Sequence, residues 1–200
     1  MLVKRRQAEN SAATRSALLK IARKLFAERG YADTATEEVV KRARVTRGAL
    51  YHHFKDKQDL FKAVLHEEQL RLASKTGEAA SKESDPWRAM LLASDAFLDA
   101  CLDPAVQQIV LLDAPAVLGA QGWREADQSY YLAGVKAAIQ ASIGAGIIEP
   151  QPVDPLAHMI LGSFNEAALL IAHAKDKKAA RREVSEVTNR LWSGLRVRPQ

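Results

Sequence analysis

The sequence has almost no cysteine and no long uninterrupted apolar segment. The single Cys101 cannot form an internal disulfide, which agrees with a reducing compartment. No uninterrupted apolar run reaches about 18 residues, so no membrane span is predicted. The opening stretch MLVKRRQAENSAATR is basic, but no apolar stretch follows it, so it does not resemble a secretory signal. These absences predict a cytoplasmic protein with no membrane partner.

The groups needed for catalysis or metal binding are also missing. His52 and His53 are neighbours, so on one helix they point about 100° apart and cannot share a metal. His158 and His173 lie too far apart on one predicted helix to converge. Cys101 sits on an apolar stripe, which favours a small core residue over a nucleophile. No glycine-rich phosphate loop is present, and the sequence predicts no catalytic residue, no metal site and no bound cofactor.

Positive charge is concentrated in the first quarter of the chain. Residues 1–56 hold 13 Lys+Arg against 6 Asp+Glu, and the remainder holds 16 against 18. A basic N-terminal part on a nearly neutral body is typical of nucleic-acid binding. A solvated basic surface would give the same composition, so the charge needs a structural context.

Residues 36–54 provide that context. Thr36 is predicted to cap a short helix over Glu37–Ala43, because its hydroxyl suits an N-cap and acids follow in the first turn. A break is expected at Arg44, and Thr46 then caps a second short helix, Arg47–His53. Two short helices joined by so tight a turn make a helix-turn-helix, whose second helix enters the DNA major groove.

The second of these helices has a polar face that suits DNA. Its hydroxyl, guanidinium, phenol, imidazole and ammonium groups are those that bond phosphates and base edges, and they belong to Thr46, Arg47, Tyr51, His52 and Lys55. Gly48 lacks a side chain and would let the backbone approach DNA closely.

The segments TRSALLKIARKLFAERGY and VTRGALYHHFKDK resemble the DNA-binding domain of the TetR family of transcriptional regulators over residues 12–72. The resemblance implies a ligand-responsive regulator, more often a repressor than an activator, that binds a palindromic operator as a homodimer. The residues expected to contact DNA are Thr36, Arg44, Thr46, Arg47, Gly48, Tyr51, His52, Lys55 and Lys57. The alternative is a helical interaction or ligand-binding module that does not bind DNA.

Arg44 departs from the family pattern, in which this turn usually carries glycine with a positive φ. A non-glycine residue in the left-handed region is strained by about 1 kcal/mol. Val40 also replaces a usual alanine on the helix that faces the turn. We therefore expect either a reshaped turn or tolerated strain, with no loss of a DNA-contacting group.

The expected fold is all-α, because strand signals are absent. A first helix over 12–28 and a fourth helix from Lys57 complete the DNA-binding domain, 12–72, after a basic flexible tail, 1–11, whose Lys4, Arg5 and Arg6 either reach DNA or stay loose. An effector-binding and dimerisation domain, 73–200, is expected to hold helices at 86–102, 104–112, 122–143, 155–174 and 177–195. Asp-Pro pairs at 85, 103 and 154 predict three of their starts.

The last two predicted helices have more apolar surface than one small domain can bury. Residues 156–174 are apolar almost all round, and the next helix carries a seam typical of helix bundles. The residues predicted to form a dimer interface are Leu161, Ala168, Val184, Val187, Leu191 and Leu195.

A small, largely apolar effector is expected in the second domain. Asn165 and Glu166 interrupt an apolar helix, and buried polar groups need a partner, which is either a neighbouring helix or a ligand. The residues predicted to line the effector pocket are Phe97, Cys101, Trp123, Tyr130, Met159, Asn165 and Glu166.

Overall fold

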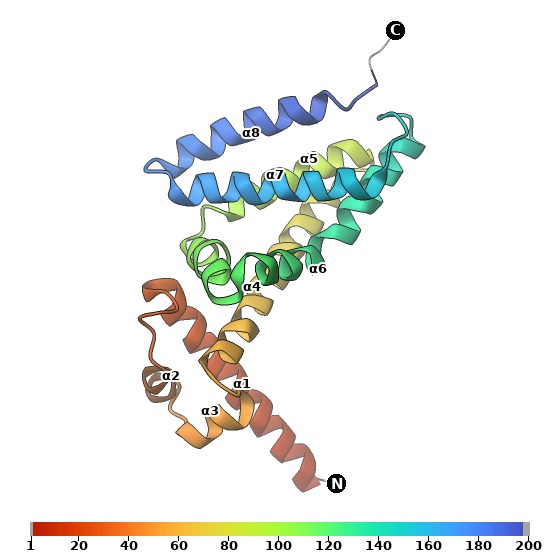
Figure 1. The fold of residues 1–200 in the computed structure, drawn as a ribbon. Helices are drawn as coiled ribbons and strands as arrows, with labels where there is room; N and C mark the ends of the chain where they lie inside the picture. Colours follow the sequence, from red (N-terminus) through yellow and green to blue (C-terminus); the bar gives the residue numbers. More distant parts are fainter. Residues whose placement is uncertain (1, 198–200) are drawn as a thin grey trace.

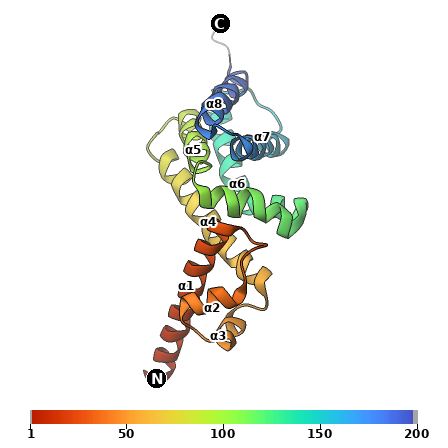
Figure 2. The same cartoon turned by 90° about the vertical axis from the view of Figure 1, so that its left-hand side faces the viewer.

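The molecule consists of a small helical unit and a larger one, joined by a long helix. The computed structural model describes residues 2–197, with side chains from residue 9 onward. Helices α1 (Leu2–Arg29), α2 (Thr36–Ala43) and α3 (Arg47–His53) form one end, and α4 (Lys57–Ala80) leads from it into the other (Figure 1). The second end holds α5 (Pro86–Ala100), η1 (Val106–Asp113), α6 (Ala114–Gly144), α7 (Val153–His173) and α8 (Lys177–Ser193) (Figure 2).

The all-α prediction is confirmed. Within residues 2–197 the only β-type pairing is an isolated bridge between Ile148 and Arg196. The first helix begins at Leu2, well before the predicted start at residue 12. The side chains of Lys4, Arg5 and Arg6 lie outside those that the structure describes.

Two of the three helix starts predicted from Asp-Pro pairs have the expected aspartate cap. Asp85 accepts from the N–H groups of Trp87 and Arg88, both at 2.9 Å, and Asp103 accepts from Ala105 N at 2.8 Å. The third predicted start is wrong. Helix α7 begins at Val153 after Pro152, and Asp154 lies in its first turn, where its carboxylate pairs with Lys136 at 2.9 Å. The carboxylate of Asp154 therefore pairs with Lys136 of α6 and does not cap α7.

The middle of the second unit is irregular. Residues 106–113 form a π-helix, which leads directly into α6. Gly119 interrupts α6 with φ 74° and ψ 162°, a conformation that glycine adopts without a Cβ clash. The break separates a short helical segment, which begins at Ala114, from the long remainder of α6.

Helix α4 is attached firmly to α1. Glu68 is buried, and its carboxylate accepts two bonds from the Arg23 guanidinium, at 2.5 and 3.1 Å, as well as one from Arg71. Phe26 of α1 and Phe61 of α4 pack edge to face with ring centroids 5.3 Å apart. The small unit and the start of α4 therefore share one core.

Helix α7 packs inside the larger unit along only part of its circumference. Ile160, Phe164 and Ile171 are buried, whereas Met159 and Leu170 are 73% and 54% exposed. By length and composition α7 is the one described helix that would suit a membrane span. Its buried face and its place against α6 and α8 instead make it a core helix with a second, uncovered apolar side.

Candidate DNA-binding surface and effector cavity

The turn between α2 and α3 keeps the strained geometry, which is one of the two outcomes that the sequence left open. Arg44 has φ 56° and ψ 41°, and it is the one non-glycine residue with positive φ in the described part of the chain. Its N–H donates to Lys41 O at 3.3 Å, and Val45 N donates to Val40 O at 3.2 Å. These bonds close the helix end and hold Arg44 in the left-handed region.

Helix α3 is held by its N-terminal cap and its buried side, and its polar face lies in solvent. The Thr46 hydroxyl accepts from Ala49 N at 3.1 Å, as predicted for its cap, and Leu50 is fully buried. The Arg47 side chain is 71% exposed, and its guanidinium lies 5.5 Å from the centre of the Tyr51 ring. The exposed face therefore keeps donors that the fold itself does not need.

Most of the residues predicted to contact DNA lie on this surface. The exposed members are Arg44, Thr46, Arg47, Gly48, Tyr51, His52 and Lys55. Thr36 is half-buried at the start of α2, and the N-cap is Ala35, so the predicted Thr36 cap is wrong. Its hydroxyl bonds its own neighbour Glu37 at 3.3 Å instead.

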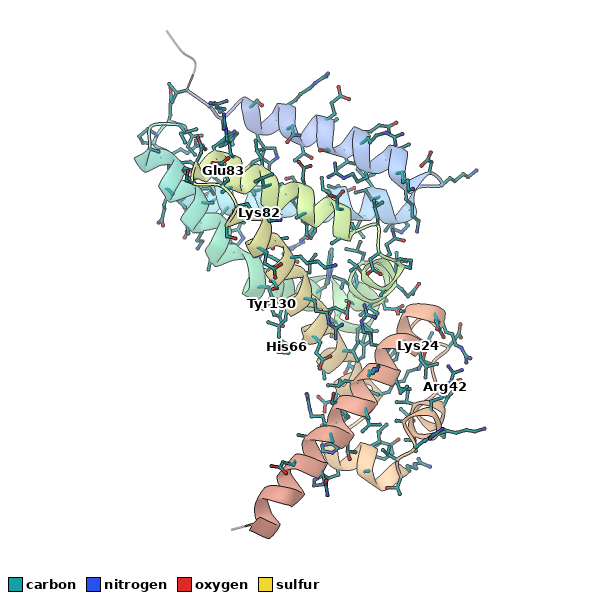
Figure 3. The ribbon with its side chains drawn as sticks, turned by 180° about the vertical axis from the view of Figure 1, so that it is seen from behind. Lys24, Arg42, His66, Lys82, Glu83 and Tyr130 are labelled. Carbon is teal, nitrogen blue, oxygen red and sulfur yellow. The ribbon has the colours of Figure 1, made fainter. Side chains whose placement is uncertain are left out.

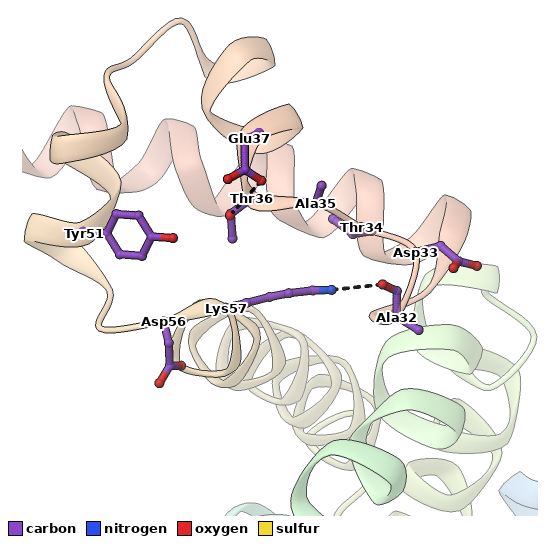
Figure 4. A pocket seen from close by; sticks show the side chains of 9 residues that line it. All are labelled: Ala32, Asp33, Thr34, Ala35, Thr36, Glu37, Tyr51, Asp56 and Lys57. Atoms are coloured by element: carbon purple, nitrogen blue, oxygen red, sulfur yellow. Dashed lines mark hydrogen bonds between the residues drawn. The ribbon is translucent and has the colours of Figure 1, made fainter.

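Lys57 faces the protein. Its ammonium donates to Ala32 O at 3.1 Å (Figure 4). The same ammonium lies 4.4 Å from the centre of the Tyr31 ring. Burial lowers the pKa of this lysine. Lys57 borders a hollow of about 440 Å³ beside α3, and Asp33, Glu37 and Asp56 also line it, so the hollow does not suit a phosphate. The cation is used to hold the turn after α1.

Two hydrogen bonds connect the small unit and the start of α4 to the irregular middle segment, and a third, within that segment, holds Asp113 in place. The Asp113 carboxylate accepts from Tyr31 N at 2.7 Å and from Gln108 Nε2 at 3.0 Å. The Gln58 side chain donates to Val117 O at 2.9 Å. Burial raises the pKa of Asp113, and the two hydrogen bonds oppose that change. The π-helix and the first part of α6 thus contact the DNA-binding end directly.

A cavity of about 290 Å³ opens between α4, α5, α6 and α7. Of the residues predicted for an effector pocket, Phe97, Tyr130 and Asn165 line it. Tyr130 also bonds His66 of α4 through its hydroxyl, and Figure 3 shows these two side chains together.

The other four predicted pocket residues lie elsewhere. Cys101 is wholly buried in the core, and burial raises the pKa of its thiol to about 12, which leaves it unreactive. Trp123 packs against the core outside the cavity lining. Met159 and Glu166 lie on the exposed side of α7, because helical spacing places them away from Asn165 and Phe164.

The sequence did not single out the most polar part of this cavity. Asp127 is buried, its Oδ2 accepts from Asn165 Nδ2 at 3.1 Å, and burial raises the pKa of its carboxyl to about 6. Tyr131 donates to Gln69 Oε1 at 2.7 Å. Asp127, Tyr131 and Gly134 are spaced along one face of α6, which was the available signal. Three other helices supply the apolar surroundings, and no local pattern shows those.

Fold and surface define a class: a helix-turn-helix DNA-binding protein with a separate helical domain. Comparison with known proteins gives the family. Residues 18–64 match the model of bacterial regulatory proteins of the tetR family, and residues 87–195 match a tetracyclin repressor-like C-terminal domain. The chain belongs to the TetR family of transcriptional regulators.

Individual relatives agree. A TetR-family transcriptional regulator from Pectobacterium atrosepticum is 34% identical, with a TM-score of 0.83 over 96% of this chain and 98% of that one. The Transposon Tn10 TetC protein of Escherichia coli is 29% identical over 178 residues, 88% of this chain and 87% of that protein. The HTH-type transcriptional regulator AcrR of Shigella flexneri is 43% identical over 60 residues, 30% of this chain and 28% of its own length.

Proposed function

We propose that this regulator is a cytoplasmic repressor that binds a palindromic operator as a homodimer and releases it when a small effector binds. The observation that carries the proposal is the exposed polar face of α3. Its guanidinium, phenol, hydroxyl and imidazole groups stand in solvent on a helix whose other side is locked into the core. A recognition helix in a major groove needs this arrangement.

Base reading is assigned to the centre of that face. Arg47 and Tyr51 are exposed one helical turn apart on α3, and Gly48 would let the backbone come close to the groove. Phosphate contacts are assigned to Thr36, Arg44, Thr46, His52 and Lys55 around them. Lys57 is left out, because its ammonium already bonds Ala32.

The dimer interface is assigned to the exposed apolar side of α7 and α8. Val187 and Leu191 are 57% and 65% exposed, and Met159 and Leu170 extend the same kind of surface on α7. Val184 and Leu195 are half-buried at its border. Leu161 and Ala168 are buried in their own subunit, so this part of the predicted interface is replaced by Met159 and Leu170.

The functional division is proposed within α4, with DNA binding in 12–72 and effector binding and dimerisation in 73–200. The predicted flexible tail at 1–11 is replaced by the first turns of α1, which begins at Leu2. Helix α4 is continuous across this division. Its first turns share a core with α1, and Ala73, Thr76, Gly77 and Ala80 line the cavity. A ligand that prefers another position of α4 would shift the DNA-binding end, since ligands act by differential affinity for two states.

Solved structures of the same fold hold ligands of different chemistry. RolR was solved with resorcinol, is 20% identical to this chain and has a TM-score of 0.68. FadR from Bacillus subtilis was solved with stearoyl-CoA, is 20% identical and has a TM-score of 0.69. They support a small-molecule effector for this chain without indicating its class.

The test is fluorescence anisotropy with labelled DNA from the protein's own upstream region. We expect specific binding to a palindrome, weaker binding to a single half-site, and loss of affinity as salt rises, because bound phosphates release counterions. Scrambled DNA of the same length is the control. A chain that binds neither DNA would be a helical interaction module instead, and equal binding to both DNAs would contradict sequence-specific recognition.

A further inference from the structure

The cavity between α4, α5, α6 and α7 has an unusual balance of charge. Nineteen residues line it, and Asp127 is the one acid among them. No lysine, arginine or histidine contributes to the lining. A carboxylate, phosphate or sulfate ligand would therefore meet a like charge and find no cation to pair with. The lining selects against anions.

Asp127 itself has no positive partner. It is 5% exposed, and the Asn165 amide, at 3.1 Å, is the donor recorded for its carboxylate in residues 2–197. None of the ion pairs in the described chain includes it. A buried carboxylate without a cation is unfavourable, because it has left water for a medium that solvates charge poorly. Burial accordingly raises the pKa of Asp127 to about 6, and the Asn165 bond only partly offsets this.

Aromatic rings surround the rest of the cavity. The ring centroid of Phe97 lies 5.8 Å from that of Phe164 and 6.3 Å from that of Tyr131, and the two ring planes of each pair are inclined by 70°. Tyr130 completes the set, 6.3 Å from Tyr131. All four rings line the cavity. The faces of such rings attract cations as well as apolar groups.

We propose that this cavity binds a small apolar ammonium compound, with its nitrogen against the Asp127 carboxylate and its hydrocarbon body among the four rings. The proposal deepens the proposed function, because it rests on the cavity's being the effector site. The volume of about 290 Å³ is at the small end of ligand pockets, which suits a single-ring amine better than a long acyl chain.

The experiment is isothermal titration of the full chain at pH 7.5 with three probes that share a phenyl ring and a short chain. They are phenethylammonium, neutral 2-phenylethanol and the anion 3-phenylpropionate. We expect the cation to bind about tenfold or more tightly than the alcohol, and the anion not to bind. Equal or tighter binding of the alcohol or the anion would overturn the proposal, as would no binding of the cation.

Asp127→Asn removes the charge and keeps an oxygen that can accept from Asn165. It should weaken cation binding about tenfold or more and leave the alcohol unchanged. Glu125→Gln is the matched control, since it removes an exposed acid from α6, the helix that carries Asp127, and Glu125 does not line the cavity. An unchanged cation affinity in Asp127→Asn, in protein with wild-type helicity and a cooperative melt, would overturn the assignment of Asp127.

A second readout separates this proposal from the proposed function. The same probes are added to the operator complex, and anisotropy is followed. Cation binding that depends on Asp127 but releases no DNA would support the cationic site and overturn induction through the cavity. Release by the alcohol or the anion, with no dependence on Asp127, would support induction and overturn the cationic site.

Discussion

The two ends of this regulator both hold polar groups with few partners, but in different surroundings. At the DNA-binding end, Arg47 and Tyr51 are exposed, so water solvates them and the free protein loses little stability by carrying them. In the cavity, Asp127 is buried, and its charge has no counter-ion in the described chain. An exposed site can be added to a fold almost freely, whereas a buried one lowers the stability of the empty protein. Removing the polar groups of the DNA-binding end should therefore leave stability unchanged, whereas removing the buried charge of the cavity should raise it.

The proposed dimer surface offers the largest expected effect; it lies at the second end but outside the cavity. Leu191→Arg places a guanidinium in the proposed α7–α8 interface, and burying it unpaired would cost several kcal/mol of association free energy. Leu191 is 65% exposed in the single subunit, so the variant should fold. We expect a monomer by sedimentation and an operator affinity reduced about 100-fold or more.

Val187→Arg should act in the same way, because Val187 is also exposed on α8. Arg182→Ala changes an exposed α8 residue outside the predicted seam and serves as the control. Two folded dimers that still bind operator after both arginine substitutions would contradict the interface.

Asp127→Asn tests the buried side of the comparison without any ligand. The pKa of Asp127 is raised from 3.8 to about 6 in the folded protein, so folding disfavours its charged form. The penalty is absent below pH about 4, grows between 4 and 6, and is complete above 6. At about 1.4 kcal/mol for each pKa unit, the variant should be more stable at pH 7.5 by up to about 3 kcal/mol.

Denaturant unfolding at pH 4 and pH 7.5 measures this difference. The neighbouring titratable groups will not confuse it, since burial raises the pKa values of Cys101, Tyr130 and Tyr131 above this range. A variant that is less stable than wild type at pH 7.5 would mean that the Asp127–Asn165 bond supports the fold, and the contrast between the two ends would disappear.

Arg47→Ala tests the exposed side. Among the side chains that the structure describes, its guanidinium meets the Tyr51 ring and, at 4.0 Å, Glu37. We expect operator binding to weaken by about 1–3 kcal/mol, the range for a base-reading contact, with an unchanged melting temperature. Equal operator affinity would remove Arg47 from the DNA surface, and a large loss of stability would make it structural.

Arg44→Gly gives the smallest expected effect and sharpens the comparison, because here the DNA-binding end does store strain. With φ at 56°, glycine should stabilise the fold by about 0.5–1 kcal/mol. Operator affinity should fall slightly if the guanidinium also contacts a phosphate. Thermal unfolding of the free protein and anisotropy of the complex distinguish the two effects, and a less stable glycine variant would contradict the strain.

The sequence predicted the DNA-binding end better than the cavity for a physical reason. Thr46, Arg44 and Leu50 act within one or two turns of chain, where capping, backbone sterics and helical spacing decide the outcome. Asp127 acquires its surroundings from α4, α5 and α7, and its partner Asn165 is 38 residues away. The contacts of Lys57 were missed in the same way, because the Tyr31 ring and the Ala32 carbonyl that its ammonium contacts come from the turn after α1.

The attachment of α4 to α1 makes α4 a lever. It has 24 residues, so at about 1.5 Å per residue it is about 36 Å long. The Arg23–Glu68 bonds tie α1 to the N-terminal half of α4, so the DNA-binding unit should move together with that half of the helix. A rotation of only about 5° about the cavity end would carry that unit about 3 Å. In a symmetric pair the separation of the two recognition helices would change by up to about 6 Å, against an operator spacing of about 34 Å. A ligand no larger than one aromatic ring would therefore be enough to move the two recognition helices away from the spacing of the operator's major grooves.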